Sequence, residues 1–327
     1  MNSKRDARSL ARETIAQSLE LARSGRLESA RRTLDRLAAN HALLEVAELG
    51  PVTMLGLPRK LHSAYLKLAK IMNDPVRVAG LQSTLAPPLD LLAGLFAFDG
   101  EQRRQMTRLG GERAPSVLHQ IWLGTLPVPP ATEAWRQHCK SHGLEYRLWR
   151  EIDLAAAGYD NHPSFHDMLA RGDYPGAVDV ARYMILERFG GIYLDCDWYP
   201  ARDDLSFADY LPLTGISVLA EDIPRKTKTG SLLLANSFIA APARHPVFSR
   251  IVEAMPRVME LLPRAPAWWS TGPLIFTLAC RGTSVCVAEA GFVSADLPRQ
   301  APFETLETAR RSAVKRDGGL LIGWKSW

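Results

Sequence analysis

The sequence has no apolar run approaching the 18 to 20 or so residues that a helix needs to cross a bilayer. Its four cysteines show no paired C-x-x-C spacing, so neither a zinc site nor a disulfide framework is indicated. The N-terminal stretch is charged and amphipathic, without the continuous apolar core of a signal peptide. We therefore expect a soluble chain in a reducing, cytoplasmic compartment.

The chain also has only a small excess of charge of one sign. The 40 basic and 35 acidic residues leave a net charge of +5 over 36.2 kDa. This mild excess suits an anionic small molecule or a membrane surface and does not demand nucleic acid, so no nucleic-acid partner is expected. With 46% hydrophobic residues, the 327-residue chain has the composition of a globular protein and is long enough for two domains.

The N-terminal third has a helical pattern. From about Arg8 to Asn40, apolar residues recur at three and four positions on both sides of Gly25, which predicts two antiparallel helices. This pair looks like one tetratricopeptide-type hairpin, and residues 61–88 are a weaker second copy. Since stacked repeats usually need three or more units, we predict an all-α domain over residues 1–110. Its basic faces are either solvated surface or a contact to a protein partner or the inner face of the membrane.

Residues 111–327 have a different hydrophobic pattern from the N-terminal third. Strand-like segments alternate with helical patterns there, at 146–149, 191–195, 216–222 and 237–241. Such alternation predicts an α/β domain with a mostly parallel sheet, whose ligands bind at the carboxyl ends of the strands.

Two aspartates stand one residue apart in this domain. After Gly190 and Gly191 end a helix, "IYLDCD" alternates with period two, so Tyr193, Asp195 and Asp197 are expected on one face. Paired carboxylates at the end of an apolar strand repel each other and resist burial unless a cation or hydrogen-bond donors compensate them. Mg²⁺ or Mn²⁺ is the natural compensator, because it takes one or two carboxylates and leaves the other positions to phosphates and water. A strand that runs into a solvated turn is the alternative.

Asp179 and Arg182 lie one helical turn apart just upstream. If their helix packs on the sheet, Arg182 can meet a phosphate or a sugar, and Asp179 can accept hydrogen bonds from sugar hydroxyls. The alternative is an i,i+3 surface ion pair worth no more than about 0.5 kcal/mol.

The string "AVDVARYMILERFGGIYLDCDWYP", residues 177–200, resembles the sugar-binding, D-x-D-containing glycosyltransferases of family 32. That group includes yeast-type α-1,6-mannosyltransferases, bacterial capsular-polysaccharide transferases and, more distantly, the catalytic domains of clostridial glucosylating toxins. The resemblance covers about residues 115–327 and implies a GT-A fold, a UDP- or GDP-sugar donor and retention of anomeric configuration. It also implies Mn²⁺ or Mg²⁺ at Asp195 and Asp197. By analogy the acceptor is a saccharide or lipid-linked saccharide in surface or capsular polysaccharide synthesis.

The resemblance also carries roles to single residues. It implies catalytic roles for Asp179, Arg182, Asp195 and Asp197, and donor contacts from Gln120, Trp122, Tyr183, Tyr193, Asn236, Ser326 and Trp327. Trp122, in "LHQIWLG", is implied as the platform for the nucleotide base, with a core tryptophan as the alternative. Many relatives carry a His-His pair shortly before the C-terminal element where this chain has "LIG", which puts a metal ligand there in doubt.

Three further residues lie near the implied donor site. His245 is expected to cap a helix or to pack rather than to act in the site. Thr271 and Gly272 are expected to open a helix close to it.

Two rival functions remain open. Haloacid-type phosphohydrolases also place D-x-D after an apolar strand, although Tyr199 stands where they generally have threonine or valine. A helical-repeat binding protein with a degenerate transferase domain is the other.

Overall fold

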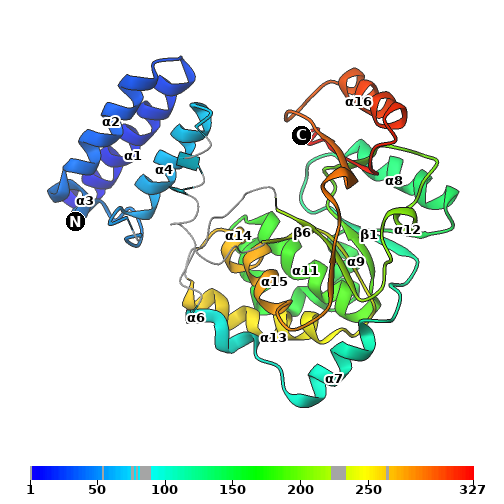
Figure 1. The fold of residues 1–327 in the computed structure, drawn as a ribbon. Coiled ribbons are helices and arrows are strands. Elements are labelled where there is room, and N and C mark those ends of the chain that lie inside the picture. The colour runs from blue at the N-terminus through cyan, green and yellow to red at the C-terminus, as the bar shows by residue number, and fades with distance from the viewer. Residues whose placement is uncertain are drawn as a thin grey trace. The chain divides into compact units, whose positions relative to one another are not determined.

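The computed structural model describes residues 2–53, 55–74, 77, 78, 80, 81, 90–221, 233–262 and 265–327. These residues divide into two compact units, one made of the described residues up to 81 and one of those from 90 onward (Figure 1). Among the helices in the described ranges, none combines the length and the apolarity needed to cross a membrane.

The first unit is helical, as predicted. It contains α1 (Asn2–Arg23), α2 (Leu27–Ala39), α3 (His41–Ala47) and α4 (Arg59–Ile71). Gly25 has φ +81° in the turn between α1 and α2, a conformation that glycine adopts without strain. The two helices run antiparallel (Figure 1), and the buried Ser18 hydroxyl donates to the carbonyl of Ala30 across the pair at 2.8 Å. The predicted second hairpin begins as α4, but much of it lies outside the described residues.

The second unit is built on a six-stranded mixed sheet in the order β2-β1-β3-β6-β5-β7. Three of its neighbouring pairs are parallel, and the two that involve β6 are antiparallel. The predicted α/β architecture with a mostly parallel sheet is therefore confirmed at this level. The strands are β1 (Val117–Ile121), β2 (Glu145–Trp149), β3 (Gly191–Leu194), β5 (Ile216–Ala220), β6 (Leu234–Ala241) and β7 (Val285–Val287).

Helices cover both faces of this sheet (Figure 1). The helices of the second unit are α6 (Asp90–Ala93), α7 (Gly100–Leu109), α8 (Pro130–Ser141), α9 (Glu151–Ala156), α10 (Pro163–Ala170), α11 (Tyr174–Phe189), α12 (Phe207–Tyr210), α13 (Pro246–Leu261), α14 (Ala267–Ser270), α15 (Pro273–Ala279) and α16 (Phe303–Lys315). Short 3₁₀ turns occupy Gly94–Phe96, Tyr159–Asn161 and Ala290–Phe292. Leu118, Ile192 and Phe238 pack with Trp135 of α8 and Phe207 of α12 on one face.

A second, three-stranded sheet joins segments that are far apart in the chain. It pairs β4 (Trp198–Pro200) antiparallel with β9 (Leu321–Gly323), and β9 parallel with β8 (Val293–Asp296). This pairing carries the C-terminus back to the segment that follows the D-x-D.

The predicted domain boundary near residue 110 differs from the division seen in the structure. Residues 90–109 group with the second unit, so the change falls between residues 81 and 90. The reason is packing: Arg250 of α13 donates to Gln102 Oε1 at 3.2 Å and lies 5.9 Å from the Phe98 ring. The helical pattern alone did not distinguish a helix of the first unit from one that packs on α13.

Candidate active site

The D-x-D lies in a tight turn at the carboxyl end of β3. The strand ends at Leu194, the Asp195 N–H donates to the Ser237 carbonyl at 2.8 Å, and Trp198 N–H closes the turn on the Asp195 carbonyl at 3.3 Å. The predicted period-two alternation therefore stops before Asp197. Turn geometry, rather than a continuing strand, places the second carboxylate.

Two glycines fix the approach to β3. Gly190 has φ +62°, and a Cβ there would lie 2.4 Å from the Ala243 nitrogen. Gly191 has φ +92°, and its Cβ would lie 2.6 Å from Val117 Cγ1. Any larger residue would push β3 away from its neighbours, so "GG" sets where the aspartates emerge.

Arg182 of α11 joins Asp179 to the D-x-D. Its Nη2 lies 3.0 Å from Asp179 Oδ1 and 3.1 Å from Asp195 Oδ1, and its guanidinium lies 4.5 Å from the Tyr193 ring centroid. Arg182 is only 3% exposed, so this is a buried ion-pair network and not the surface pair considered as the alternative. The network fixes the direction in which Asp195 points.

Both oxygens of Asp179 are already bound inside the protein. Asn236 Nδ2 donates to Oδ1 at 2.8 Å, and the Thr271 hydroxyl donates to Oδ2 at 2.9 Å. Burial raises the pKa of Asp179 to about 6, and the Arg182 charge opposes that rise. A Cβ on Gly272 would lie 3.1 Å from Asp179 Oδ2, so a small residue is needed there. Asp179 is thus part of the supporting structure behind the site, and the expectation that Thr271 and Gly272 open a helix, α15, next to it is confirmed.

Three more implied donor contacts also lie behind the site. Tyr193 is fully buried, and its hydroxyl donates to Asp195 Oδ1 at 2.6 Å. Gln120 is fully buried, and its Nε2 donates to the Asp195 carbonyl at 3.3 Å. Tyr183 is fully buried too, and its hydroxyl accepts from Asn236 Nδ2 at 3.0 Å. All three orient groups of the site from the interior.

Asp197 is held by the C-terminal segment. The Trp324 N–H donates to its carbonyl at 2.6 Å, and this bond continues the β4–β9 ladder. Burial and the neighbouring Asp195 charge raise the pKa of the Asp197 carboxyl, while the Lys325 ammonium opposes that rise. The charge of Asp197 is therefore only partly compensated by the chain itself.

Two cavities meet at the D-x-D. The first, of about 310 Å³, is the Trp122 cavity, and its walls include Trp122, Tyr174, Val178, Arg182 and Trp327. The second, of about 460 Å³, is the Glu289 cavity, and its walls include Trp198, Glu221, Ser237, Glu289, Asp296 and Gly323. Asp195, Asp197 and Lys325 line both of them. A ligand in either cavity would contact the acid pair.

Aromatic rings form one wall of the Trp122 cavity. The Trp122 and Trp327 rings meet edge to face with centroids 4.7 Å apart, and Trp122 Nε1 donates to the Leu126 carbonyl at 3.0 Å. Trp122 is only 8% exposed, so it is both a packed side chain and a cavity wall. Ser326, between Lys325 and Trp327, is not among the residues that line either cavity, and its implied contact stays a prediction.

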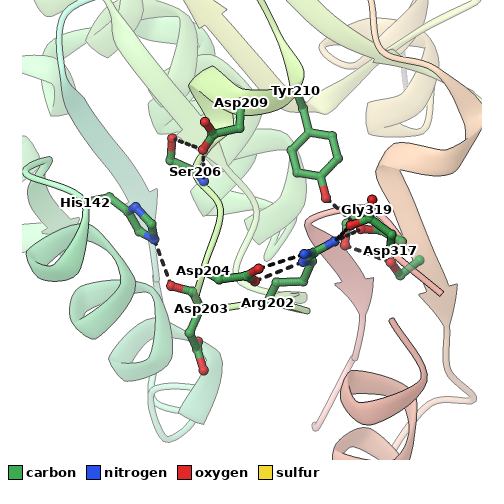
Figure 2. A network of polar contacts seen from close by, with 11 residues as sticks. His142, Arg202, Asp203, Asp204, Ser206, Asp209, Tyr210, Asp317 and Gly319 are labelled. Atoms are coloured by element: carbon green, nitrogen blue, oxygen red, sulfur yellow. Dashed lines mark hydrogen bonds and ion pairs between the residues drawn. The ribbon is translucent and has the colours of Figure 1, made fainter. Parts of the chain in front are cut away.

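A polar network anchors the strand that delivers this C-terminal segment (Figure 2). Arg202, just after β4, is 6% exposed, forms an ion pair with Asp204 at 2.7 Å and another with Asp317, and donates to the Gly318 carbonyl at 3.2 Å. The Tyr210 hydroxyl donates to the same carbonyl at 2.6 Å. The turn before β9 is thereby fixed to the segment after β4.

The structure brings Asp195, Asp197, Arg182, Trp122 and Trp327 together around one cavity. Of the other implied residues, those in the interior behind it are Gln120, Asp179, Tyr183, Tyr193 and Asn236. His245 caps α13, since its Nδ1 accepts from the Val247 N–H at 3.3 Å, and the expectation that it caps or packs is confirmed. Sequence reasoning missed Tyr174 and Lys325. The dipeptide "YP" at the start of α11 and the lysine inside "GWKSW" were the available signals.

The acid pair fits a divalent cation in its chemistry. Among the described residues, no group of three or more histidine, cysteine, aspartate or glutamate side chains is arranged to hold a metal ion. Two carboxylates beside open space would suit Mg²⁺ or Mn²⁺, because such an ion takes one or two protein carboxylates and leaves its other positions to phosphates and water.

Comparison with known proteins supports the resemblance found in the sequence. Residues 131–209 match the family described as "Glycosyltransferase sugar-binding region containing DXD motif". Mannosyl phosphorylinositol ceramide synthase SUR1 of Saccharomyces cerevisiae is 25% identical over 169 residues, which are 50% of this chain and 41% of that protein. Inositol phosphoceramide mannosyltransferase 1 of Schizosaccharomyces pombe is 32% identical over 101 residues, 26% of this chain and 28% of that protein.

Two further similarities are to a viral protein and to a solved structure. An uncharacterized glycosyltransferase, L373, of Acanthamoeba polyphaga mimivirus is 28% identical over 146 residues, 43% of this chain and 55% of that protein. The solved structure of PaToxG glycosyltransferase superimposes with a TM-score of 0.41 at 16% identity, over 66% of this chain and 83% of that chain. The chain thus spans about two fifths of the length of the yeast relative. Residues 131–209 are thus similar to the sugar-binding, DXD-containing region of glycosyltransferases.

Proposed function

We propose that this chain is a divalent-metal-dependent glycosyltransferase of the GT-A type that moves a hexose from a UDP- or GDP-sugar to a hydroxyl acceptor, with retention of configuration. The observation that carries the proposal is the acid pair at the junction of two cavities. A transferase needs two substrates on either side of one reacting carbon, and this arrangement provides two such places.

We assign the Trp122 cavity to the donor. Its indole rings offer a surface for a nucleotide base, because aromatic faces stack on any base. Arg182 borders the same cavity, and its Nε has no hydrogen-bond acceptor among the described residues.

The Glu289 cavity is left for the acceptor. Carboxylates in its wall, Glu221, Glu289 and Asp296, suit a ligand rich in hydroxyl groups. One related yeast protein is named as a mannosyl phosphorylinositol ceramide synthase and another as an inositol phosphoceramide mannosyltransferase. These names favour mannose as the sugar and an inositol-bearing lipid as the acceptor. A saccharide or lipid-linked saccharide, as in capsule synthesis, remains the other acceptor class.

The residues of the site have different roles in the transfer reaction. Asp195 and Asp197 would hold Mn²⁺ or Mg²⁺, whose Lewis acidity stabilises the departing diphosphate by several kcal/mol. Arg182 and Tyr193 keep Asp195 in its orientation, and the two tryptophans exclude water that would hydrolyse the donor. The bond from the sugar carbon to the donor phosphate oxygen breaks, the acceptor oxygen bonds to that carbon, and its proton passes to the departing phosphate.

The test is to incubate the protein with UDP- and GDP-hexoses and Mn²⁺ and to measure nucleoside diphosphate release. We expect metal-dependent release that Asp195→Ala lowers by at least about a hundredfold, on the scale of lost metal stabilisation. Asp160→Ala, on an exposed turn, is the matched control. Release of phosphate from generic phosphomonoesters would support the phosphohydrolase, and absence of any turnover would support the binding protein.

The first unit is proposed to place the enzyme at a protein partner or at the inner face of a membrane, near a lipid acceptor. Its own apolar core, which includes Ala11, Leu34 and Leu61, is what an independent docking module requires. The cytoplasmic location predicted from composition belongs to the same proposal.

A further inference from the structure

The proposed reaction assigns no role to Lys325. This residue shares with Asp195 and Asp197 the position at the junction of both cavities. Its backbone is tightly held, because the Trp324 N–H bonds the Asp197 carbonyl at 2.6 Å and the Lys325 carbonyl accepts from Gln300 N–H at 2.7 Å. Its side chain is exposed and rotatable, with Nζ 5.3 Å from the Trp327 ring centroid.

The two cations that border the Trp122 cavity differ in how far their charge is balanced. Arg182 is buried and already paired with Asp179 and Asp195. Lys325, in contrast, has no carboxylate within 4 Å among the residues that the structure describes. It is therefore the cation that can take a new anionic ligand without giving up an ion pair.

Lys325 lies near the acid pair without forming an ion pair with it, since it lines both cavities together with Asp195 and Asp197. Lys325 acts on Asp197 only through its field, which opposes the rise in that carboxyl's pKa. An ammonium on four methylenes can swing from the acid pair to a phosphate oxygen while its backbone stays fixed.

We propose that Lys325 binds the diphosphate of the nucleotide donor directly and stabilises it as the leaving group, independently of the metal. This inference rests on the proposed function and names a residue that the D-x-D motif does not include. It assigns to the middle residue of "GWKSW" the recognition of the charged part of the donor, while Trp122 and Trp327 recognise its base.

The experiment measures the binding of UDP, GDP and the corresponding nucleosides to the full chain by calorimetry, in Mn²⁺ and in EDTA. Lys325→Ala should weaken diphosphate binding by about tenfold to a hundredfold, the scale of one hydrogen bond to a charged group, and leave nucleoside binding unchanged. Lys325→Arg should retain most of the affinity. Lys315→Ala, an exposed lysine at the end of α16 that lines neither cavity, should bind as the wild type does.

The possible results distinguish the proposed function from the role assigned to Lys325. If the wild type binds neither nucleotide under any condition, the proposed function fails and this inference fails with it. If the wild type binds diphosphates and Lys325→Ala binds them equally well, only the lysine assignment is overturned. A loss that appears in Mn²⁺ but vanishes in EDTA would also overturn it, because the lysine would then act through the metal site. Thermal unfolding of each variant establishes that it is folded.

Discussion

The Arg182 guanidinium binds two carboxylates at once, with Nη2 3.0 Å from Asp179 Oδ1 and 3.1 Å from Asp195 Oδ1. One residue on a helix thereby ties the interior of the second unit to the acid that faces both cavities. The same buried charge supports the fold and orients the site.

Arg182→Met should therefore be severely destabilising. The substitution keeps most of the volume but leaves Asp179 and Asp195 without their shared counter-charge, which typically costs about 3–5 kcal/mol. Urea unfolding measures the loss. Arg257→Ala, which breaks an i,i+3 pair whose side chains are 59% and 65% exposed, should cost less than about 1 kcal/mol. Equal losses in the two variants would contradict the buried-network account.

Thr271→Val tests the hydrogen bond behind the site. Valine has nearly the same shape but cannot donate to Asp179 Oδ2, so the buried carboxylate loses a donor, at about 1–3 kcal/mol of unfolding free energy. Donor turnover should fall as well, because Arg182 then holds a less constrained partner. Thr308→Val, exposed on α16, is the control and should change stability by no more than about 0.5 kcal/mol. A Thr271→Val protein with wild-type stability would count against the network.

The anchor around Arg202 should affect nucleotide binding at a distance (Figure 2). Arg202→Met frees the turn at Asp317 and Gly318, so β9 and the residues after it are held less firmly, and the affinity for UDP or GDP should drop. Asp209→Asn is the matched control, since Asp209 bonds Ser206 in the same network without touching that turn. Both affinities are measured by calorimetry. Nucleotide affinity unchanged in Arg202→Met would show that the anchor does not govern the site.

His245 should make the fold sensitive to acid. Burial lowers the pKa of its imidazole from 6.5 to about 4, so between these pH values the unfolded chain binds the extra proton. The stability it contributes is complete above pH 6.5 and declines as the pH falls toward 4, by about 2 kcal/mol near pH 5. His119 and His138 share this direction, whereas the raised pKa of Asp179 acts against it.

The contribution of His245 is isolated by His245→Asn, because asparagine keeps a capping acceptor but does not titrate. Denaturant unfolding of the wild type and the variant at several pH values gives the two slopes. The variant should lose less stability on acidification. Parallel curves would mean that His245 is not buried in its neutral form.

Much of this architecture could be predicted from local pattern. The end of α11 at the glycines 190 and 191 and the alternation of β3 are each indicated by a few neighbouring residues. Strands β4 and β9 could not be predicted that way, because each has three residues and its pairing joins distant parts of the chain. That pairing brings Lys325 close to Asp197, so the position of the lysine beside the acid pair depends on the tertiary fold and could not be predicted from local sequence. The burial of Asp179 likewise depends on Thr271 and Asn236, which only the tertiary fold brings together.

The most direct test of the central claim is the calorimetric affinity of the full chain for UDP and GDP, with and without Mn²⁺, in the wild type and in Asp197→Asn. If the acid pair holds a cation against the donor diphosphate, Mn²⁺ should tighten binding to the wild type, and the substitution should abolish that increase. Nucleotide binding that is the same in Mn²⁺ and EDTA, or a Mn²⁺ effect that survives in Asp197→Asn, would contradict the account.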